Sequence, residues 1–70
     1  MKHRTQYRVF RLDGQWAAFG PRRMDYWIVP RMARVSNGGR RQEYVVLGRT
    51  PFDAYYRCRT AMIKMGCNIR

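Results

Sequence analysis

The feature that most constrains the fold of this chain is a predicted helix over residues 51–65, because typical capping residues mark both of its ends. Thr50 is a favoured N-cap, because its hydroxyl can accept a hydrogen bond from the first turn, and Pro51 suits the first helical position. Gly66 suits the left-handed residue that ends a helix. We therefore predict one helix, which needs the rest of the chain to supply a sheet for it to pack on.

Apolar residues within this segment recur at helical spacing and predict the face that packs against the sheet. They are Ala54, Tyr55, Cys58, Ala61, Met62 and Met65, widened by Phe52, Tyr56 and Ile63. Asp53, Arg57, Thr60 and Lys64 mark the solvent face, with Asp53 and Arg57 spaced as an i,i+4 ion pair. Cys67 is placed to contact Met62 after the helix ends, as in a Schellman motif. We interpret the stripe as core and not as a cofactor site.

Asp13-Gly14 lies between two short runs of alternating apolar residues, a pattern typical of a two-residue hairpin turn. We predict strands over residues 7–12 and 15–19, which pair Leu12 with Gln15, Phe10 with Ala17 and Arg8 with Phe19. One face would carry Phe10, Leu12, Ala17 and Phe19, and the other Tyr7, Val9, Arg11, Trp16 and Ala18. We expect the first face to be the core side.

A second hairpin is predicted from the run YWIVPRMARV, the turn SNGGRR and the strand QEYVVL. Pro30 cannot donate a ladder hydrogen bond, so the first of these strands is expected at an edge or interrupted there. The fold class is therefore α+β, a three- to four-stranded antiparallel sheet of two hairpins packed against one C-terminal helix. Residues 1–70 form one small domain, with residues 1–5 frayed, 7–47 in the sheet and 51–65 helical.

The charge is strongly positive and is spread along the folded part of the chain. Lys and Arg number 15 against 4 Asp and Glu, for a formal net charge of +11. Six basic residues precede Asp25, five lie between Tyr26 and Thr50, and four follow. Such an excess favours an anionic partner. Thirteen of the fifteen are arginine, which binds phosphates and guanine edges well, although a GC-rich genome would also favour arginine.

Catalysis and cofactor binding have little support in the sequence. The four carboxylates are scattered, and Asp13, Glu43 and Asp53 already have structural positions in a turn, a strand and a helix start. One histidine, His3, and two cysteines, Cys58 and Cys67, are too few ligands for a structural zinc site. We expect no enzyme, no cofactor and no metal. Without a secretory signal or a membrane-spanning run, we expect reduced thiols and a cytoplasmic location, on the nucleoid if the protein binds DNA.

The predicted partner is nucleic acid, with DNA favoured over RNA. We expect Arg8, Arg11, Trp16, Arg31 and Arg34 to project from the sheet face opposite the helix, where strands can enter a DNA major groove. Arg40, Arg41 and Arg49 would lie at the ends of that face. Arg40 and Arg41 are expected to contact the phosphate backbone and to leave base reading to the strand arginines.

Four short motifs also resemble those of AP2/integrase-type DNA-binding domains. They are Tyr7-Arg8-x-x-Arg11, Gly14-x-Trp16-Ala17-Ala18, Leu47-Gly48-x-Thr50 and Ala54-Tyr55. The resemblance implies a three-stranded sheet that packs on one helix and enters the major groove. It implies base or phosphate contact for Arg8, Arg11 and Trp16, and structural roles for Leu47, Gly48 and Ala54. Residues 20–40 exceed the family's hairpin, which leaves room for a fourth strand.

Other classes of function remain open alternatives. The first is a small phage-type inhibitor that binds an acidic surface of a host protein, with Trp27, Tyr44 or Tyr56 as anchors. RNA binding through stacking on the same aromatic residues is a second. A membrane-surface helix is a distant third, because few basic residues flank the apolar face of the predicted helix.

Overall fold

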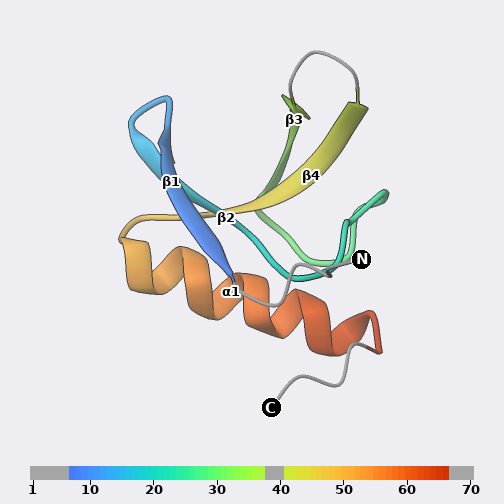
Figure 1. The fold of residues 1–70 in the computed structure, drawn as a ribbon. Helices are drawn as coiled ribbons and strands as arrows, with labels where there is room; N and C mark the ends of the chain where they lie inside the picture. Colours follow the sequence, from blue (N-terminus) through green and yellow to red (C-terminus); the bar gives the residue numbers. More distant parts are fainter. Residues whose placement is uncertain (1–6, 38–40, 67–70) are drawn as a thin grey trace.

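The chain folds into a four-stranded antiparallel sheet with one helix packed across one face (Figure 1). The computed structural model describes residues 7–37 and 41–66, without the side chains of Asn37 and Arg41. The elements are β1 (Arg8–Leu12), β2 (Gln15–Phe19), β3 (Met32–Asn37), β4 (Arg41–Gly48) and α1 (Pro51–Lys64). The strand order is β1-β2-β4-β3, so the two hairpins join through β2 and β4. The predicted fold class is confirmed, with four strands.

The first hairpin has the predicted turn and register. Leu12 pairs with Gln15, and Phe10 pairs with Ala17. Asp13 has φ of 50° and Gly14 has φ of 79°, so both turn residues adopt the left-handed backbone that a tight two-residue hairpin requires.

The helix begins and ends where the sequence predicts, to within one residue. The Thr50 hydroxyl accepts a hydrogen bond of 3.0 Å from the Asp53 N–H, and Pro51 is the first helical residue. Gly66 follows the C-cap with φ of 81°, and its N–H donates to the Ile63 carbonyl at 2.9 Å. The predicted contact of Cys67 lies outside the described residues.

The segment between β2 and β3 is a loop, although the sequence predicted an extended run from about residue 26. Pro30 removes a backbone donor, and Arg31 adopts φ of 65°, so regular pairing begins only at Met32. The loop is nevertheless tied to the sheet. The Tyr44 N–H donates to the Met24 carbonyl at 3.0 Å, and the Met24 side chain is fully buried. The loop therefore takes the place of a strand partner for β4 beyond the point where β2 ends.

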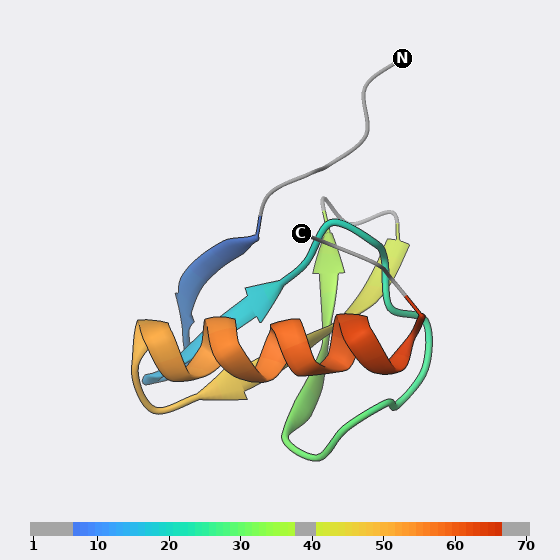
Figure 2. The same cartoon turned by 90° about the horizontal axis from the view of Figure 1, so that it is seen from below.

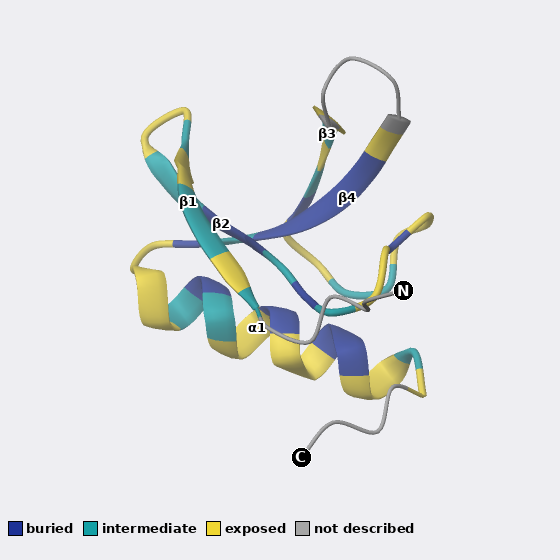
Figure 3. Cartoon of the chain, viewed as in Figure 1, coloured by how far each residue is buried: buried dark blue, intermediate teal, exposed yellow. Residues whose placement is uncertain are grey.

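The helix packs on the sheet face that the sequence assigned to solvent, so that prediction is wrong. The buried cluster between the two layers comprises Ala18, Met24, Met32, Tyr44, Val46, Ala54, Cys58, Ala61 and Met62, with Tyr7, Val9 and Trp16 packed against it. Figure 3 shows the buried side of α1 turned toward the sheet. Close approach between the backbones of the helix and β4 explains why the helix packs on this face of the sheet. A Cβ on Gly48 would overlap the backbone of Ala54, so the helix lies directly on this face.

Three large residues of the helix are exposed and do not widen the core as predicted. Phe52, Tyr56 and Ile63 keep 71%, 56% and 61% of their surface exposed. Figure 2 shows α1 lying across the sheet, and the buried residues of the helix form a narrow strip. That strip is occupied by Ala54, Cys58, Ala61 and Met62. These three large apolar residues, which recur at helical spacing, therefore form a second, exposed stripe.

Candidate nucleic-acid interface

The predicted arginine face does not exist as one surface, because strand alternation divides its members between the two faces of the sheet. Arg11 and Trp16 are paired neighbours on the helix side, the side that carries Val9 and Ala18. Arg34 pairs with Tyr44, which also belongs to the helix side. Arg8 lies on the opposite face, which we call the open face, and it is the one arginine there among the strand arginines whose side chains the structure describes. The prediction that all five residues project from the open face is wrong.

Arg11 and Trp16 form a stacked pair on the edge of the sheet. The Arg11 guanidinium carbon lies 5.2 Å from the centroid of a Trp16 ring, within range of a cation–π contact. Arg11 is exposed, whereas Trp16 is half-buried and packs against the core cluster. The indole therefore supports the arginine and anchors the edge strand β1. It offers a ligand less surface than the sequence implied.

Arg34 is held on the other edge strand, β3, by three contacts. Its guanidinium donates to the Gln42 Oε1 at 3.1 Å and to the Tyr44 hydroxyl at 2.9 Å. Its Cζ also lies 5.2 Å from the Tyr44 ring centroid. These contacts fix the position of an exposed cation. Two of the five guanidinium donors are used, so the group keeps capacity to bind a phosphate.

Two residues of the loop between β2 and β3 complete a cluster around Arg34. The Trp27 ring centroid lies 5.0 Å from that of Tyr44, tilted by 51°. Arg23 donates to the Gln42 carbonyl at 2.6 Å and forms an ion pair with Asp25 at 2.9 Å. We call Arg23, Trp27, Arg34, Gln42 and Tyr44 the tryptophan cluster.

Trp27 and Tyr44 were expected as aromatic anchors and Arg34 as a contact residue, but the sequence did not indicate that they lie together or that Arg23 joins them. The stretch GPRRMDYW was predicted to be a loop followed by a strand, although Arg22-Arg23 and Tyr26-Trp27 place two arginines next to two aromatic residues. Tyr26 and Trp27 keep 59% and 57% of their surface exposed. Interleaved arginine and aromatic residues are a common feature of nucleic-acid-binding loops, and this spacing was the available indication.

Arg31 and Arg49 lie near the start of the helix and not on a strand face. The Arg49 N–H donates to the Asp53 carboxylate at 3.0 Å, and this bond lowers the pKa of Asp53 below its usual value. Arg57, 3.1 Å from the same carboxylate, and the charge of Arg31 lower that pKa further. The predicted i,i+4 pair of Asp53 and Arg57 is confirmed.

Arg40 and the side chain of Arg41 lie outside the described residues. The backbone of Arg41 begins β4 and pairs with Asn37. Their assignment to phosphate contact stays a prediction.

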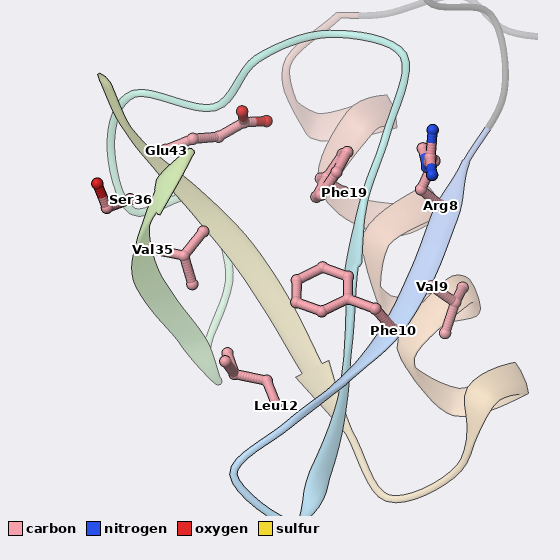
Figure 4. A pocket seen from close by; sticks show the side chains of 8 residues that line it. All are labelled: Arg8, Val9, Phe10, Leu12, Phe19, Val35, Ser36 and Glu43. Carbon is pink, nitrogen blue, oxygen red and sulfur yellow. The ribbon is translucent and has the colours of Figure 1, made fainter. Parts of the chain in front are cut away.

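The open face is an apolar groove between the two diverging hairpins (Figure 4). Its volume is about 640 Å³, and its lining includes Phe10, Leu12, Phe19 and Val35. The Phe10 and Phe19 ring centroids are 5.6 Å apart. Arg8 and the buried Glu43 lie toward one end, and Leu12 lies toward the other. One arginine and one buried carboxylate in an apolar groove do not make a phosphate-binding surface.

The described residues contain no group of three or more His, Cys, Asp or Glu side chains that could hold a metal ion. Their carboxylates are dispersed. Asp13 lies in a turn, Asp25 and Asp53 are in ion pairs with arginines, and Glu43 is buried in the sheet. Cys58 is a buried thiol between helix and sheet.

No protein-family model, no curated protein and no solved structure matches this chain. Among the described residues, α1 is too short and too polar to cross a membrane, and the chain offers no other helix there.

Proposed function

We propose that this protein binds nucleic acid through arginines on the helix side of the sheet. The observation that carries the proposal is the excess of exposed cations over carboxylates. Asp25 forms an ion pair with Arg23, and Asp53 forms one with Arg57. Among the described residues, Arg8, Arg11, Arg22, Arg31, Arg34, Arg49, Arg59 and Lys64 are exposed outside these pairs. A surface of this kind attracts a polyanion and makes binding depend strongly on salt.

The two edge strands support a specific side of approach. Arg11 on β1 and Arg34 on β3 both lie on the helix side, and each guanidinium stacks on an aromatic ring. An arginine that is already held by such a contact loses less side-chain entropy when it binds phosphate than a freely moving arginine does. Arg8 lies on the opposite face and cannot join them on one flat surface. We therefore assign phosphate contact to Arg11 and Arg34, with DNA as the first candidate ligand.

A salt titration with matched variants tests this proposal. Fluorescence anisotropy would measure the affinity for a duplex DNA, a single-stranded DNA and an RNA at several salt concentrations. If about five phosphates are neutralised, log K should fall against log salt with a slope near −4 to −5. The double variant Arg11→Gln/Arg34→Gln should reduce that slope by roughly two units, because each removed phosphate contact removes about one.

Arg8→Gln is the matched control, since it removes one exposed strand arginine from the open face. It should change the slope by less than half a unit, on the same reasoning. If Arg8→Gln reduced the salt slope by half as much as the double variant, each of the three arginines would contribute equally. That result would contradict the assigned side. Absence of binding to all three ligands at low salt would refute nucleic-acid binding itself.

The open-face groove favours a second candidate function. In this function the protein captures an acidic host protein, as a small phage-type inhibitor does. An apolar groove of about 640 Å³ flanked by Arg8 would suit an aromatic or aliphatic anchor from an acidic partner. Leu12→Asp would place a charge in that groove. A host protein captured from lysate by the wild type and by Phe52→Ala, but not by Leu12→Asp, would support this function. Tight nucleic-acid binding that Leu12→Asp leaves intact would support the first.

A further inference from the structure

We propose that the tryptophan cluster binds an unpaired nucleotide, with the base stacked on Trp27. The inference rests on the proposed nucleic-acid function and specifies which form of nucleic acid the site takes. It starts from the exposed indole. Trp27 keeps 57% of its surface exposed, yet its inner side is in contact with the Tyr44 ring at 5.0 Å between centroids.

The loop on both sides of Trp27 is anchored, so the ring is held in place before any ligand binds. On one side, Met24 is fully buried and its carbonyl accepts the Tyr44 N–H. On the other side, the N–H groups of Ile28 and Val29 point to the Met32 sulfur at 3.2 and 3.5 Å. A ring fixed in this way stacks at a low cost in conformational entropy.

Arginines contact Tyr44, which supports this ring, and Gln42 on the same strand. Arg34 lies over Tyr44, the ring that supports Trp27, and Arg23 is bonded to the carbonyl of Gln42, the residue that also accepts from Arg34. Arg22 is the exposed neighbour of Arg23. An aromatic platform next to fixed guanidinium groups matches a nucleotide, which offers a flat base and a phosphate a few bonds away.

The ligand must be unpaired, because bases inside a duplex are stacked on each other and cannot reach a tryptophan on a protein surface. Every base has a flat face, so the site should accept several bases without strict sequence preference. The sugar is not distinguished by this chemistry, so single-stranded DNA and RNA are both candidate sources.

Variants of Trp27 test the inference in the full chain. The probes are labelled dT12 and rU12 oligonucleotides and a blunt DNA duplex of 12 base pairs. Trp27→Ala should weaken binding of the single strands by about 5- to 150-fold, the range expected for one stacked base. Trp27→Phe should restore affinity to within about threefold, because a smaller aromatic ring still stacks. Duplex affinity and its salt slope should stay within about twofold and half a unit of wild type, since stacking neutralises no phosphate.

Phe52→Ala is the matched control, because Phe52 is an aromatic residue of α1 with 71% of its surface exposed. It should change single-strand affinity by less than about twofold, in line with a surface substitution away from the site. Trp27→Leu guards against misfolding, since leucine keeps an apolar contact with Tyr44 and lacks a stacking face. It should weaken single-strand binding as Trp27→Ala does.

Three outcomes would overturn the inference. The first is equal loss with Phe52→Ala and Trp27→Ala. The second is equal loss for duplex and single strands, which would make Trp27 part of a general interface. The third is unchanged oligonucleotide affinity with lost binding of poly-L-glutamate, which would assign the ring to an acidic protein. Salt-dependent duplex binding by the wild-type protein is compatible with all three outcomes, so they refute the stacking site without refuting nucleic-acid binding.

Discussion

Gly48→Ala should be the most damaging single-methyl change in this fold. A Cβ at Gly48 would lie 2.7 Å from the Ala54 Cα and 2.9 Å from the Asp53 carbonyl carbon. Both obstacles are backbone atoms of the first helical turn, so relief requires α1 to move away from β4. Overpacking usually costs about 1–3 kcal/mol, and we expect the upper end here because no side chain can rotate away. For a domain of this size, a loss of about 3 kcal/mol lowers Tm by roughly 12–24 °C.

Gly20→Ala is the control, since its Cβ would meet the Met62 side chain at 2.8 Å. Methionine is flexible and can shift, so we expect a cost of about 1 kcal/mol or less. Thermal and urea unfolding followed by circular dichroism would measure both variants. A Tm for Gly48→Ala close to wild type, or equal losses for the two variants, would refute a helix resting directly on the backbone of β4.

Three further predictions concern the helix ends and the second turn. The pKa of Asp53 is lowered in the folded state, so the ionised carboxylate stabilises the fold above its unfolded pKa near 3.8. This stabilisation is lost as the pH falls through the lower pKa of the folded state. Asp53→Asn should therefore lower Tm at pH 7 and flatten the loss of stability between pH 5 and 2. Gly66→Val should cost about 1 kcal/mol or more, because a β-branched residue resists φ of 81°; an unchanged urea midpoint would contradict that helix end. Arg40→Ala/Arg41→Ala should reduce the salt slope of nucleic-acid binding by roughly one to two units without changing sequence preference; loss of discrimination at constant slope would make these residues base readers.

Local features of the fold could be predicted because their determinants are adjacent in the sequence. The Asp13-Gly14 turn needs two residues with positive φ, and the chain supplies them in order. The helix start needs the Thr50 hydroxyl and a free N–H three residues later, which any helix would provide. In both cases the residues that interact lie within four positions of each other.

The face of the sheet that meets the helix could not be chosen by counting apolar residues, since both faces are apolar. Phe10 and Phe19 favoured the open face as the core side in the sequence, whereas the helix packs on the face that allows close backbone approach. Ala18 and Gly48 provide that approach, and small residues leave little trace in a hydropathy pattern. The predicted positions of Arg11 and Arg34 depended on this choice of face, so they were wrong as well.

The tryptophan cluster was missed because its members come from distant segments. Arg23 and Trp27 belong to a loop, and Arg34, Gln42 and Tyr44 belong to two strands. Their meeting depends on the hydrogen bond from Tyr44 to Met24, which replaces a strand partner where β2 has ended. The sequence showed the alternation of arginine and aromatic residues in the loop, and it showed Trp27, Tyr44 and Arg34 as separate candidate contact residues.

The strand order has a consequence for how the chain folds. Each hairpin closes between neighbours in sequence, β1 with β2 across a two-residue turn and β3 with β4 across residues 38–40. Within the described sheet the two hairpins pair with each other through β2 and β4, where Trp16 pairs with Gly48 across 32 positions. Closing that loop carries the largest entropy cost in the sheet, so the rate of folding should depend on it. Mutations at the β2–β4 pair Ala18 and Val46 should slow folding, whereas changes within either turn should mainly speed unfolding.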